Sequence, residues 1–386
     1  MASVSVVIPC RDEGEFIEDL LDAVRAQDLP PTETIVVDNG NPDPQDAHRM
    51  RTALTVSVVI PCRNESATIA RLLEAIAGQD QLPDEVIVVD DASTDGTAEV
   101  VAAWRREKGK LEVRVVRGAG RGVAAAMNVG IRAAQSEIIV RLDGHCRPAL
   151  DYIERSLDAL TIPNAGVVGG AWAIEPGAPG LAAGGIAAVL SHPLGSGGAD
   201  YRQPPRDGAK GPRSVDTVPF GTFRRDLWQR LGGFDESLIR NQDYDFNHRV
   251  RLTGLDVILD PAIVSVYKAR STFGSLARQY FDYGFWKVVM LRKFPASIRL
   301  RQLLPLLLVP ALVGLIAWAF VARSWLPLAL LAAYLALNLA GATQASLRAG
   351  DVRLILAATA ALLTLQNAWS AGAWTSLLRG ARAPQR

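Results

Sequence analysis

The sequence contains few cysteines and no excess of charge of either sign. Its 386 residues include three cysteines, Cys10, Cys62 and Cys146, and an odd number without paired spacing argues against a disulfide framework. We therefore expect a reducing, cytosolic environment for the soluble part of the chain. The 41 basic and 40 acidic residues give a net charge of +1, so the composition predicts no nucleic acid or other polyanion as a partner.

The start of the sequence also lacks the features of a signal peptide, because Met1–Glu13 has neither a basic segment nor a long apolar run. Long uncharged runs occur near the end instead. Leu303–Ala322 contains twenty residues without a charge, which is enough to span a bilayer as a helix. Trp325–Ala345 is a second candidate, and Leu354–Leu378 is a third, weakened by its polar residues. The sequence therefore predicts a membrane domain of two to three helices over residues 296–386.

Basic residues beside these segments predict their orientation. Five of them lie just before the first segment and place that side in the cytoplasm: Lys287, Arg292, Lys293, Arg299 and Arg301. Arg348 and Arg353, between the second and third segments, agree with this orientation. The basic residues after the third segment disagree, so either the tail crosses despite its charge or the third segment does not fully span. We expect a multi-pass protein of the inner membrane with its soluble domain in the cytoplasm.

The sequence repeats itself near its start. Ser5–Asp38 matches Ser57–Asp90 without a gap, at an offset of 52 residues. Each copy has an apolar run, a polar turn, an amphipathic pattern and a second apolar run that ends in Asp. This order is typical of a βαβ unit with parallel strands. Two copies are too few for a solenoid. We interpret residues 1–52 as a partial duplicate of the beginning of the domain that follows.

The first copy is not expected to bind a ligand. Asn39 stands where the second copy has Asp91, and no later motif follows the first copy. The polar residues of the first copy that resemble a site are therefore predicted to bind nothing: Arg11, Asp12, Glu13 and Asp38.

The second copy continues as alternating strand and helix patterns. This alternation predicts an α/β fold with a largely parallel sheet that is covered on both faces. Ligands of such sheets bind beyond the carboxyl ends of the strands. Asp91, the glycine-rich turn at Gly118–Gly122 and Asp143 all lie at expected strand ends. We therefore expect the ligand site at this edge.

The motif Asp143-Gly144-His145 follows the apolar run 136–140 directly. A carboxylate and an imidazole that point the same way from a turn can hold a divalent cation against a diphosphate. The alternative is that Asp143 caps a turn and His145 is a surface histidine, since a three-residue match is weak by itself. A nitrogen ligand favours Mn²⁺ over Mg²⁺.

Four motifs in this order resemble one enzyme family. They are PCRNE at Pro61–Glu65, VDDASTDGT at Val89–Thr97, Asp-Gly-His, and NQDYDFNHR at Asn241–Arg249. Together they resemble the family 2 glycosyltransferases of the GT-A fold, which have a Rossmann-like mixed sheet that binds a nucleotide sugar. The resemblance covers about Val56–Pro295 and implies a catalytic domain over residues 53–295. It is closest to the membrane-anchored glucosyltransferases of succinoglycan biosynthesis.

The resemblance implies roles for the residues at the strand ends. Asp91 would contact the nucleoside, and the alternative is an Asp that caps a turn. Pro61, Arg63 and Glu65 would line the base, although Arg63 is equally compatible with a surface salt bridge. Arg121, at a helix start after the glycine-rich turn, suits a diphosphate. Asp143 and His145 would bind Mn²⁺ or Mg²⁺ between the two phosphates, with Asp143 also facing the nucleotide.

Asp243 is the expected general base. A sugar hydroxyl is a poor nucleophile until it loses its proton to a carboxylate on the face opposite the leaving group. The Glu-Asp pair of the family is Gln242-Asp243 here, which removes one negative neighbour from Asp243. Asp245 is the rival base, but we expect it on another helix face as a solvated or capping residue. Arg249 either anchors the diphosphate or pairs with Asp245 at the i+4 position.

These patterns predict an inverting glycosyltransferase. It would move a sugar, expected to be glucose, from a UDP-sugar to a hydroxyl of a lipid-linked saccharide at the cytoplasmic membrane face, in contact with membrane lipid. The product would belong to an exopolysaccharide or cell-surface glycan. Two alternatives stay open, a polyprenyl-phosphate glycosyltransferase and a membrane scaffold that binds nucleotide without turnover.

Overall fold

The computed structural model of the chain describes most of the sequence, in these segments: residues 5–10, 24, 33–38, 54–108, 111–202, 211–295, 300–322 and 325–379. The chain divides into two compact units, Met1–Ala53 and Leu54–Arg386. The second unit contains both the sheet and the helices at the end of the sequence. Each unit is described separately below.

The first unit contains the two parallel strands expected of the first copy. Strand β1 (Ser5–Cys10) pairs with β2 (Glu33–Asp38), and Ser5 lies opposite Glu33. The second copy has the same register, with Ser57 opposite Glu85. Arg11, Asp12, Glu13 and Asn39 lie outside the described residues, and so does the side chain of Asp38.

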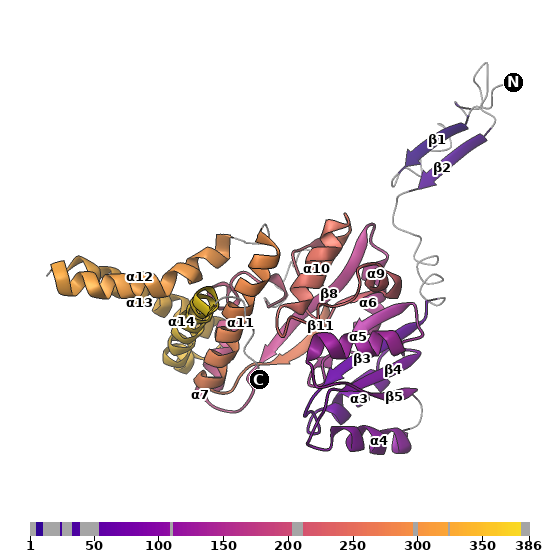
Figure 1. Ribbon diagram of the computed structural model, residues 1–386, viewed down its shortest axis with the longest axis horizontal. Helices are drawn as coiled ribbons and strands as arrows, with labels where there is room; N and C mark the ends of the chain where they lie inside the picture. Colours follow the sequence, from indigo (N-terminus) through magenta and orange to yellow (C-terminus); the bar gives the residue numbers. More distant parts are fainter. Residues whose placement is uncertain are drawn as a thin grey trace. The chain divides into compact units, whose positions relative to one another are not determined.

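The second unit is built on one mixed sheet of nine strands (Figure 1). Four strands of the second copy and its continuation are parallel, in the order β5-β4-β3-β6: β3 (Val56–Cys62), β4 (Glu85–Asp90), β5 (Val113–Arg117) and β6 (Ile138–Arg141). Helices connect them: α3 (Ile69–Ala77), α4 (Thr97–Lys108) and α5 (Val123–Ala133). This half of the sheet is therefore the predicted doubly covered α/β arrangement.

The other half of the sheet is mixed. Strand β10 (Thr222–Arg224) is antiparallel to both β6 and β8 (Ala165–Glu175), and β11 (Asp256–Lys268) is parallel to β8. Two short strands are antiparallel to β11: β7 (Arg147–Pro148) and β9 (Arg213–Ser214). Three further helices pack on this half: α6 (Tyr152–Leu160), α9 (Arg225–Arg230) and α10 (Gln242–Leu252). The short helix α8 (Pro193–Ser196) contacts the helices α7 (Leu181–Leu190) and α14 (Ile355–Arg379) instead. The antiparallel strand makes the fold the Rossmann-like mixed sheet that the sequence predicts.

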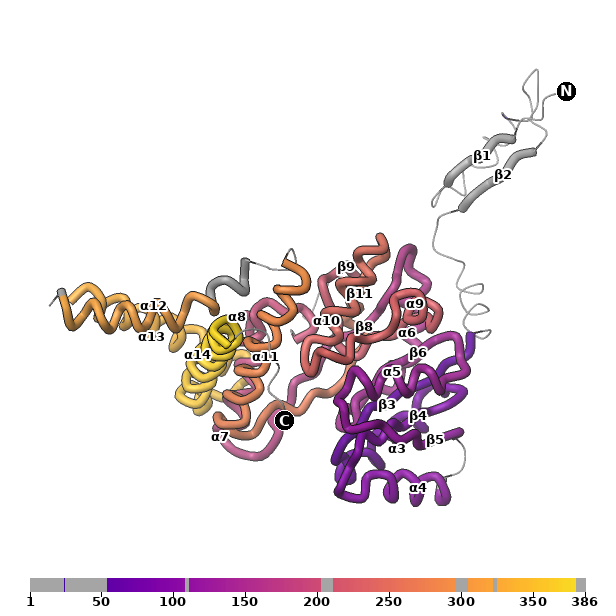
Figure 2. The backbone as a smooth tube through the Cα atoms, viewed as in Figure 1, coloured from indigo at the N-terminus to yellow at the C-terminus, as the bar shows by residue number. Residues whose placement is uncertain are grey.

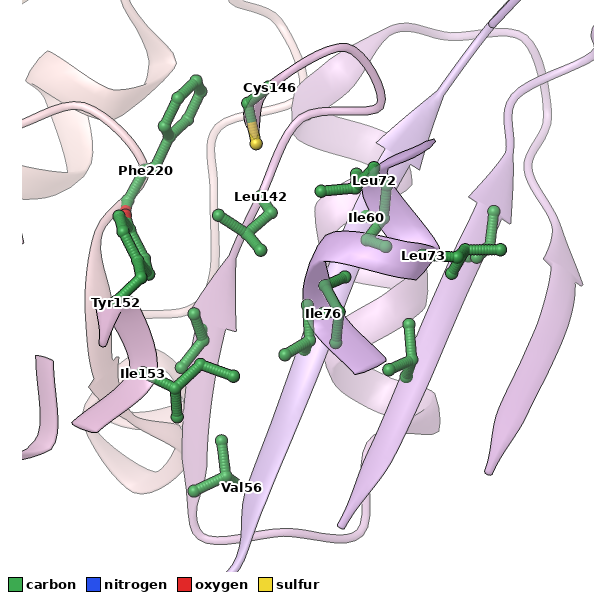
Figure 3. Close-up of a cluster of buried hydrophobic side chains, with 14 of the residues drawn as sticks. Val56, Ile60, Leu72, Leu73, Ile76, Leu142, Cys146, Tyr152, Ile153 and Phe220 are labelled. Atoms are coloured by element: carbon green, nitrogen blue, oxygen red, sulfur yellow. The ribbon is translucent and has the colours of Figure 1, made fainter. Parts of the chain in front are cut away.

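The sheet is buried on both faces because alternate residues of its strands enter two different cores. On β3, Val58 and Ile60 join the core beneath α3 and α6, whereas Val59 joins the core beneath α5 and α10. Figure 3 shows the first core, in which Leu72, Leu73 and Ile76 of α3 meet Ile60. The polar residues that follow each strand are consequently held at the sheet edge by rigid elements. Cys62 and Cys146 are buried free thiols, so neither forms a disulfide.

The second unit also contains the charged helix α11 (Phe273–Lys293) and four apolar helices of the described chain: α7 (Leu181–Leu190), α12 (Leu300–Ala322), α13 (Leu326–Arg348) and α14 (Ile355–Arg379). Two helical stretches of the described chain are long and apolar enough to cross a membrane, Leu326–Arg348 and Val352–Arg379. Pro305–Val321 is apolar but shorter. Large apolar side chains such as Phe320 and Leu356 stand exposed on these helices, as expected for contact with lipid.

Helix α11 joins the sheet to the apolar helices by packing closely on α14 (Figure 2). A Cβ atom at Gly284 of α11 would lie 2.0 Å from the carbonyl oxygen of Trp369 on α14. A Cβ atom at Gly372 of α14 would lie 2.0 Å from the carbonyl oxygen of Phe281 on α11. The two backbones can approach this closely only because both positions are glycine.

Candidate active site

The carboxyl ends of β3, β4 and β6 open into one cavity of about 520 Å³, which we call the strand-end cavity. Six residues that the sequence assigns to the nucleotide or the metal line it together: Pro61, Arg63, Glu65, Asp91, Asp143 and His145. They come from three separate loops. Parallel strands bring those loops to the same edge of the sheet, as the sequence analysis expects.

Asp91 is buried at the end of β4 and organises the glycine-rich turn. Its Oδ1 accepts a hydrogen bond from the backbone N–H of Gly120 at 2.7 Å, and its Oδ2 accepts one from Gly122 at 2.8 Å. Gly120 has a φ of +71° and Gly122 a φ of +96°, which favour glycine. Asp91 therefore fixes the loop that leads into α5, and its expected contact with the nucleoside stays a prediction.

Arg121 lies just before α5, as expected, but its side chain does not line the strand-end cavity. That side chain is 62% exposed and forms a 3.0 Å ion pair with Glu236. Besides Arg63, three cations that the sequence analysis does not name line that cavity: Arg240, Lys268 and Arg270. No motif marks these residues in the sequence. Lys268 ends β11 and Arg270 follows it, so these two reach the cavity through the pairing of β11 with β8, whereas Arg240 lies just before α10.

His145 and Glu65 form a hydrogen-bonded pair across the cavity wall. Nδ1 of His145 lies 2.8 Å from Oε1 of Glu65, whose Oε2 accepts a 2.6 Å bond from Thr68. This hydrogen bond raises the pKa of His145 above its ordinary value. For Glu65, burial alone would raise the pKa, but the bonds from His145 and Thr68 outweigh it and hold the pKa low. Glu65 thus orients the imidazole, a role not expected from the sequence.

The donor set fits a divalent cation that is shared with a diphosphate. No group of three His, Cys, Asp or Glu side chains able to hold a metal occurs in the described parts of the chain. Asp143 and His145 therefore suit a cation that takes its remaining ligands from phosphate and water. The bond from Nδ1 to Glu65 leaves Nε2 of His145 for the metal, which is the usual arrangement of a metal-binding histidine with an outer carboxylate.

Arg141 connects the expected metal ligand to the expected base. It is the last residue of β6, and its side chain is 4% exposed. Its Nε donates to Oδ1 of Asp143 at 3.0 Å, and its Nη1 forms an ion pair with Asp243 at the start of α10. Burial raises the pKa of Asp243, while the guanidinium opposes that rise. The sequence analysis assigns no role to Arg141, although it lies two residues before the Asp-Gly-His motif.

Asp245 and Arg249 form ion pairs that hold α10 in position. Asp245 is fully buried, so the expectation of a solvated or capping residue is wrong. Its carboxylate forms ion pairs with Arg249 at 2.8 Å and with Lys293 at 2.6 Å. Of the two roles open for Arg249, the structure shows the i+4 pairing. Asp245 lines neither the strand-end cavity nor the cavity described next.

A second cavity of about 360 Å³ begins at Arg141, Asp143 and Asp243 and extends to α12 and α14. We call it the helix-side cavity. Residues of these two helices that line it are Pro305, Leu365, Gln366 and Trp369. Asp143 lines both cavities, whereas Asp243 lines only the helix-side cavity. The two spaces therefore meet at the expected metal ligand Asp143 and at Arg240, and the expected base lies on the helix side.

The sequence profile described as "Glycosyl transferase family 2" matches residues 5–47 and 57–229 of the chain. The chain belongs to glycosyl transferase family 2. The two matched segments begin with the two copies of the repeat, and the second continues well beyond its copy. The resemblance drawn from the motifs is confirmed. The protein is a glycosyltransferase, and its nucleotide-sugar fold is the one expected from the sequence.

Relatives of this glycosyltransferase include proteins of polysaccharide and glycan synthesis. The chain is 29% identical to the succinoglycan biosynthesis protein ExoA of Rhizobium meliloti (strain 1021), over 85% of this chain and 96% of that protein. It is 26% identical to a Methanococcus voltae enzyme, dolichyl N-acetyl-alpha-D-glucosaminyl phosphate 3-beta-D-2,3-diacetamido-2,3-dideoxy-beta-D-glucuronosyltransferase, over 62% of this chain and 74% of that enzyme.

A solved structure shows the same fold. The mannosyltransferase PcManGT from Pyrobaculum calidifontis, in complex with GDP-Man and Mn²⁺, matches this glycosyltransferase with a TM-score of 0.59. The identity is 23%, and the match covers 87% of this chain and 93% of that chain. The likeness shows that the described sheet is a GT-A fold.

Proposed function

We propose that this glycosyltransferase moves a sugar, with inversion, from a UDP-sugar to a hydroxyl of a lipid-linked saccharide. The observation that carries the proposal is the junction of the two cavities at Asp143, one at the strand ends and one reaching the apolar helices. The sugar would be glucose, and the product an exopolysaccharide or cell-surface glycan, as suggested by the relative in succinoglycan biosynthesis. The reaction would take place at the cytoplasmic face of the inner membrane.

The donor would occupy the strand-end cavity. Arg240, Lys268 and Arg270 place positive charge on its wall, which suits a diphosphate. Asp143 and His145 would hold Mn²⁺ or Mg²⁺ there. When bound, the cation supplies Lewis-acid stabilisation of the negative charge that develops on the departing UDP.

The acceptor would enter through the helix-side cavity, where Asp243 faces it. Asp243 would take the proton of the acceptor hydroxyl as that oxygen attacks the anomeric carbon. The ion pair with Arg141 holds the carboxylate of Asp243 in place. Burial raises the pKa of Asp243, and the positive charge of Arg141 opposes this rise, which favours the ionised form that a base requires. A single displacement with one base and no protein nucleophile inverts the anomeric configuration.

Transfer to polyprenyl phosphate is the second candidate. Its support is a pair of buried cations in the helix-side cavity, Arg202 and Lys287, which suit an acidic acceptor. An acceptor that is already an anion would need no strong base. The 35% identity, over 27% of the chain, to the undecaprenyl-phosphate 4-deoxy-4-formamido-L-arabinose transferase of Aeromonas hydrophila also supports this candidate.

A panel of radiolabelled nucleotide sugars, incubated with membranes that contain the full chain, tests the proposal. UDP release should depend on lipid-linked saccharide and should be highest with UDP-glucose. Release that depends instead on polyprenyl phosphate would favour the second candidate. Nucleotide binding without release under any condition would indicate a scaffold that has lost turnover.

A further inference from the structure

Two buried cations stand in the wall of the helix-side cavity. Arg202 is 7% exposed and Lys287 is 5% exposed, and both line the cavity. Arg202 is the last residue of a short 3₁₀ helix, Asp200–Arg202, which follows α8 in the chain. Lys287 lies on α11. Neither residue takes part in the expected chemistry of the donor, because neither lines the strand-end cavity.

Arg202 is surrounded by aromatic rings rather than by carboxylates. Its guanidinium lies 5.5 Å from the ring centre of Trp172, 5.7 Å from that of Tyr201 and 5.8 Å from that of Tyr283. Its Nη1 donates to the hydroxyl of Tyr280 at 2.9 Å, and its Nε has no hydrogen-bond partner. Within the described segments, the contacts of the Arg202 guanidinium are thus with tyrosine and tryptophan side chains.

The aromatic rings stabilise this buried charge, but they carry no negative charge that neutralises it and leave the N–H of Nε without an acceptor. Burying a cation without a counter-ion is costly. An anion bound in the cavity would balance that cost and would also accept the free N–H of Nε. The arrangement of Arg202 is therefore that of a binding site for an anion.

Lys287 adds a second positive charge close to the expected acceptor. Its Nζ lies 3.8 Å from the ring centre of Tyr244, the residue that follows Asp243 on α10. Two cations on one cavity wall suit a group that carries more than one negative charge. A phosphate or a diphosphate has the charge and the acceptor oxygens that this site requires.

The far end of the cavity identifies what the anion is attached to. It is lined by Pro305 of α12 and by Leu365 and Trp369 of α14, and α14 is one of the helices long and apolar enough to cross a membrane. An anionic head beside Arg202 with an apolar chain along these residues is the chemistry of a lipid phosphate. A free anion without an apolar chain would make no favourable contact with the apolar end of the cavity.

We propose that Arg202 and Lys287 bind the phosphate or diphosphate of the lipid-linked acceptor, with the lipid chain leaving along Pro305, Leu365 and Trp369. The inference rests on the proposed function and adds the subsite that recognises its acceptor. The same subsite serves a lipid-linked saccharide and a polyprenyl phosphate, because both present this oxyanion next to an apolar chain.

Direct binding to the full chain in detergent tests the subsite without any turnover. The probe is geranylgeranyl diphosphate, and the comparison ligands are geranylgeraniol, which lacks the anion, and inorganic pyrophosphate, which lacks the chain. The diphosphate ester should bind more tightly than either. Pyrophosphate binding as tightly as the ester would overturn the assignment to a lipid, and geranylgeraniol binding as tightly would overturn the anion site.

The variants Arg202→Gln and Lys287→Met should each weaken binding of geranylgeranyl diphosphate by about 10- to 100-fold, the value of a hydrogen bond to a charged group. Arg230→Gln is the matched control, because Arg230 is exposed on α9 and pairs with Asp226. Its affinity for the probe should equal that of the unmodified chain. UDP binding shows whether each variant is folded. If Arg202→Gln folds poorly, Arg202→Lys replaces it in the test. Because Arg202→Lys keeps the positive charge, it should bind geranylgeranyl diphosphate better than Arg202→Gln does.

The subsite and the proposed function fail in different ways. If the variants lose the probe but the unmodified chain transfers no sugar to lipid, the subsite stands and the function is wrong. If the chain transfers sugar and both variants show an unchanged KM for the lipid acceptor, the function stands and the subsite is wrong.

Discussion

The buried guanidinium of Arg141 forms an ion pair with Asp243, although the two residues are 102 positions apart in the sequence. The same guanidinium donates to Asp143 at 3.0 Å. A single cation therefore fixes the relative positions of the expected metal ligand and the expected base. Because Arg141 is nearly inaccessible to solvent, its position depends on β6 rather than on the ligand.

Replacing Asp243 with Asn should lower turnover by about 10²–10⁴-fold, the usual value of general-base catalysis. The amide keeps the shape of the side chain but cannot take a proton. UDP binding, measured by calorimetry, should barely change, because Asp243 lines only the helix-side cavity. Asp91→Asn is the contrasting variant and should weaken UDP binding first, since an amide can accept from only one of Gly120 and Gly122. Transfer at the unmodified rate by Asp243→Asn would indicate that the acceptor is already an anion.

Replacing Arg141 with Met should shift the pH profile of sugar transfer. The positive charge lowers the pKa of Asp243 against the effect of burial. Without it the pKa of Asp243 rises further, so the acid limb of the profile should move to higher pH. Asp243 acts as a base only above its pKa, which fixes this direction. The profile of kcat is the measurement, and an acid limb that stays in place or moves to lower pH would contradict the role of Arg141.

Chelation should abolish activity, and Mn²⁺ or Mg²⁺ should restore it. A metal binds only the neutral imidazole, and Glu65 raises the pKa of His145. Mn²⁺ affinity should therefore fall as the pH falls, beginning above the range of an ordinary histidine. Glu65→Gln removes the charged partner, lowers the pKa of His145 and should move this loss to lower pH. Mn²⁺ titration of the UDP-bound protein at several pH values measures the shift. Unaltered metal dependence in His145→Ala would remove His145 from the site.

Replacing Gly284 with Ala should destabilise the packing of α11 on α14 by about 1–3 kcal/mol, a typical cost of overpacking. The added Cβ would meet the carbonyl oxygen of Trp369, which is backbone and cannot rotate away. Gly274→Ala is the matched control on the same helix, because nothing lies within 4 Å of its Cβ position. Thermal unfolding of both variants in detergent gives the comparison, and equal midpoints would argue against the close contact.

Deleting residues 1–52 should leave sugar transfer nearly intact. The first unit is compact by itself, and every residue that lines the two cavities belongs to the second unit. Activity per folded molecule, with UDP binding as the check on folding, is the measurement. A truncated chain that folds but no longer binds UDP would show that the first copy contributes to the site.

Local patterns in the sequence determined the strands of the second copy, the edge at which they end and the loops that carry ligands there. Strand and helix periodicity depend on residues close together in the chain, so these features could be predicted without coordinates. The order of four motifs also identified the family. Asp143, His145 and Asp91 accordingly lie at the cavity where the sequence placed them.

Only the tertiary structure shows which charged side chains form ion pairs with one another. Arg121 pairs with Glu236 instead of reaching the cavity, and Asp245 is buried by Arg249 and Lys293. Arg141, at the end of β6, forms an ion pair with Asp243, at the start of α10. Apart from the i+4 pair of Asp245 and Arg249, these contacts join loops or helices far apart in the sequence. Distance and burial in the folded chain decide which charged side chains pair, and the order of residues does not specify either.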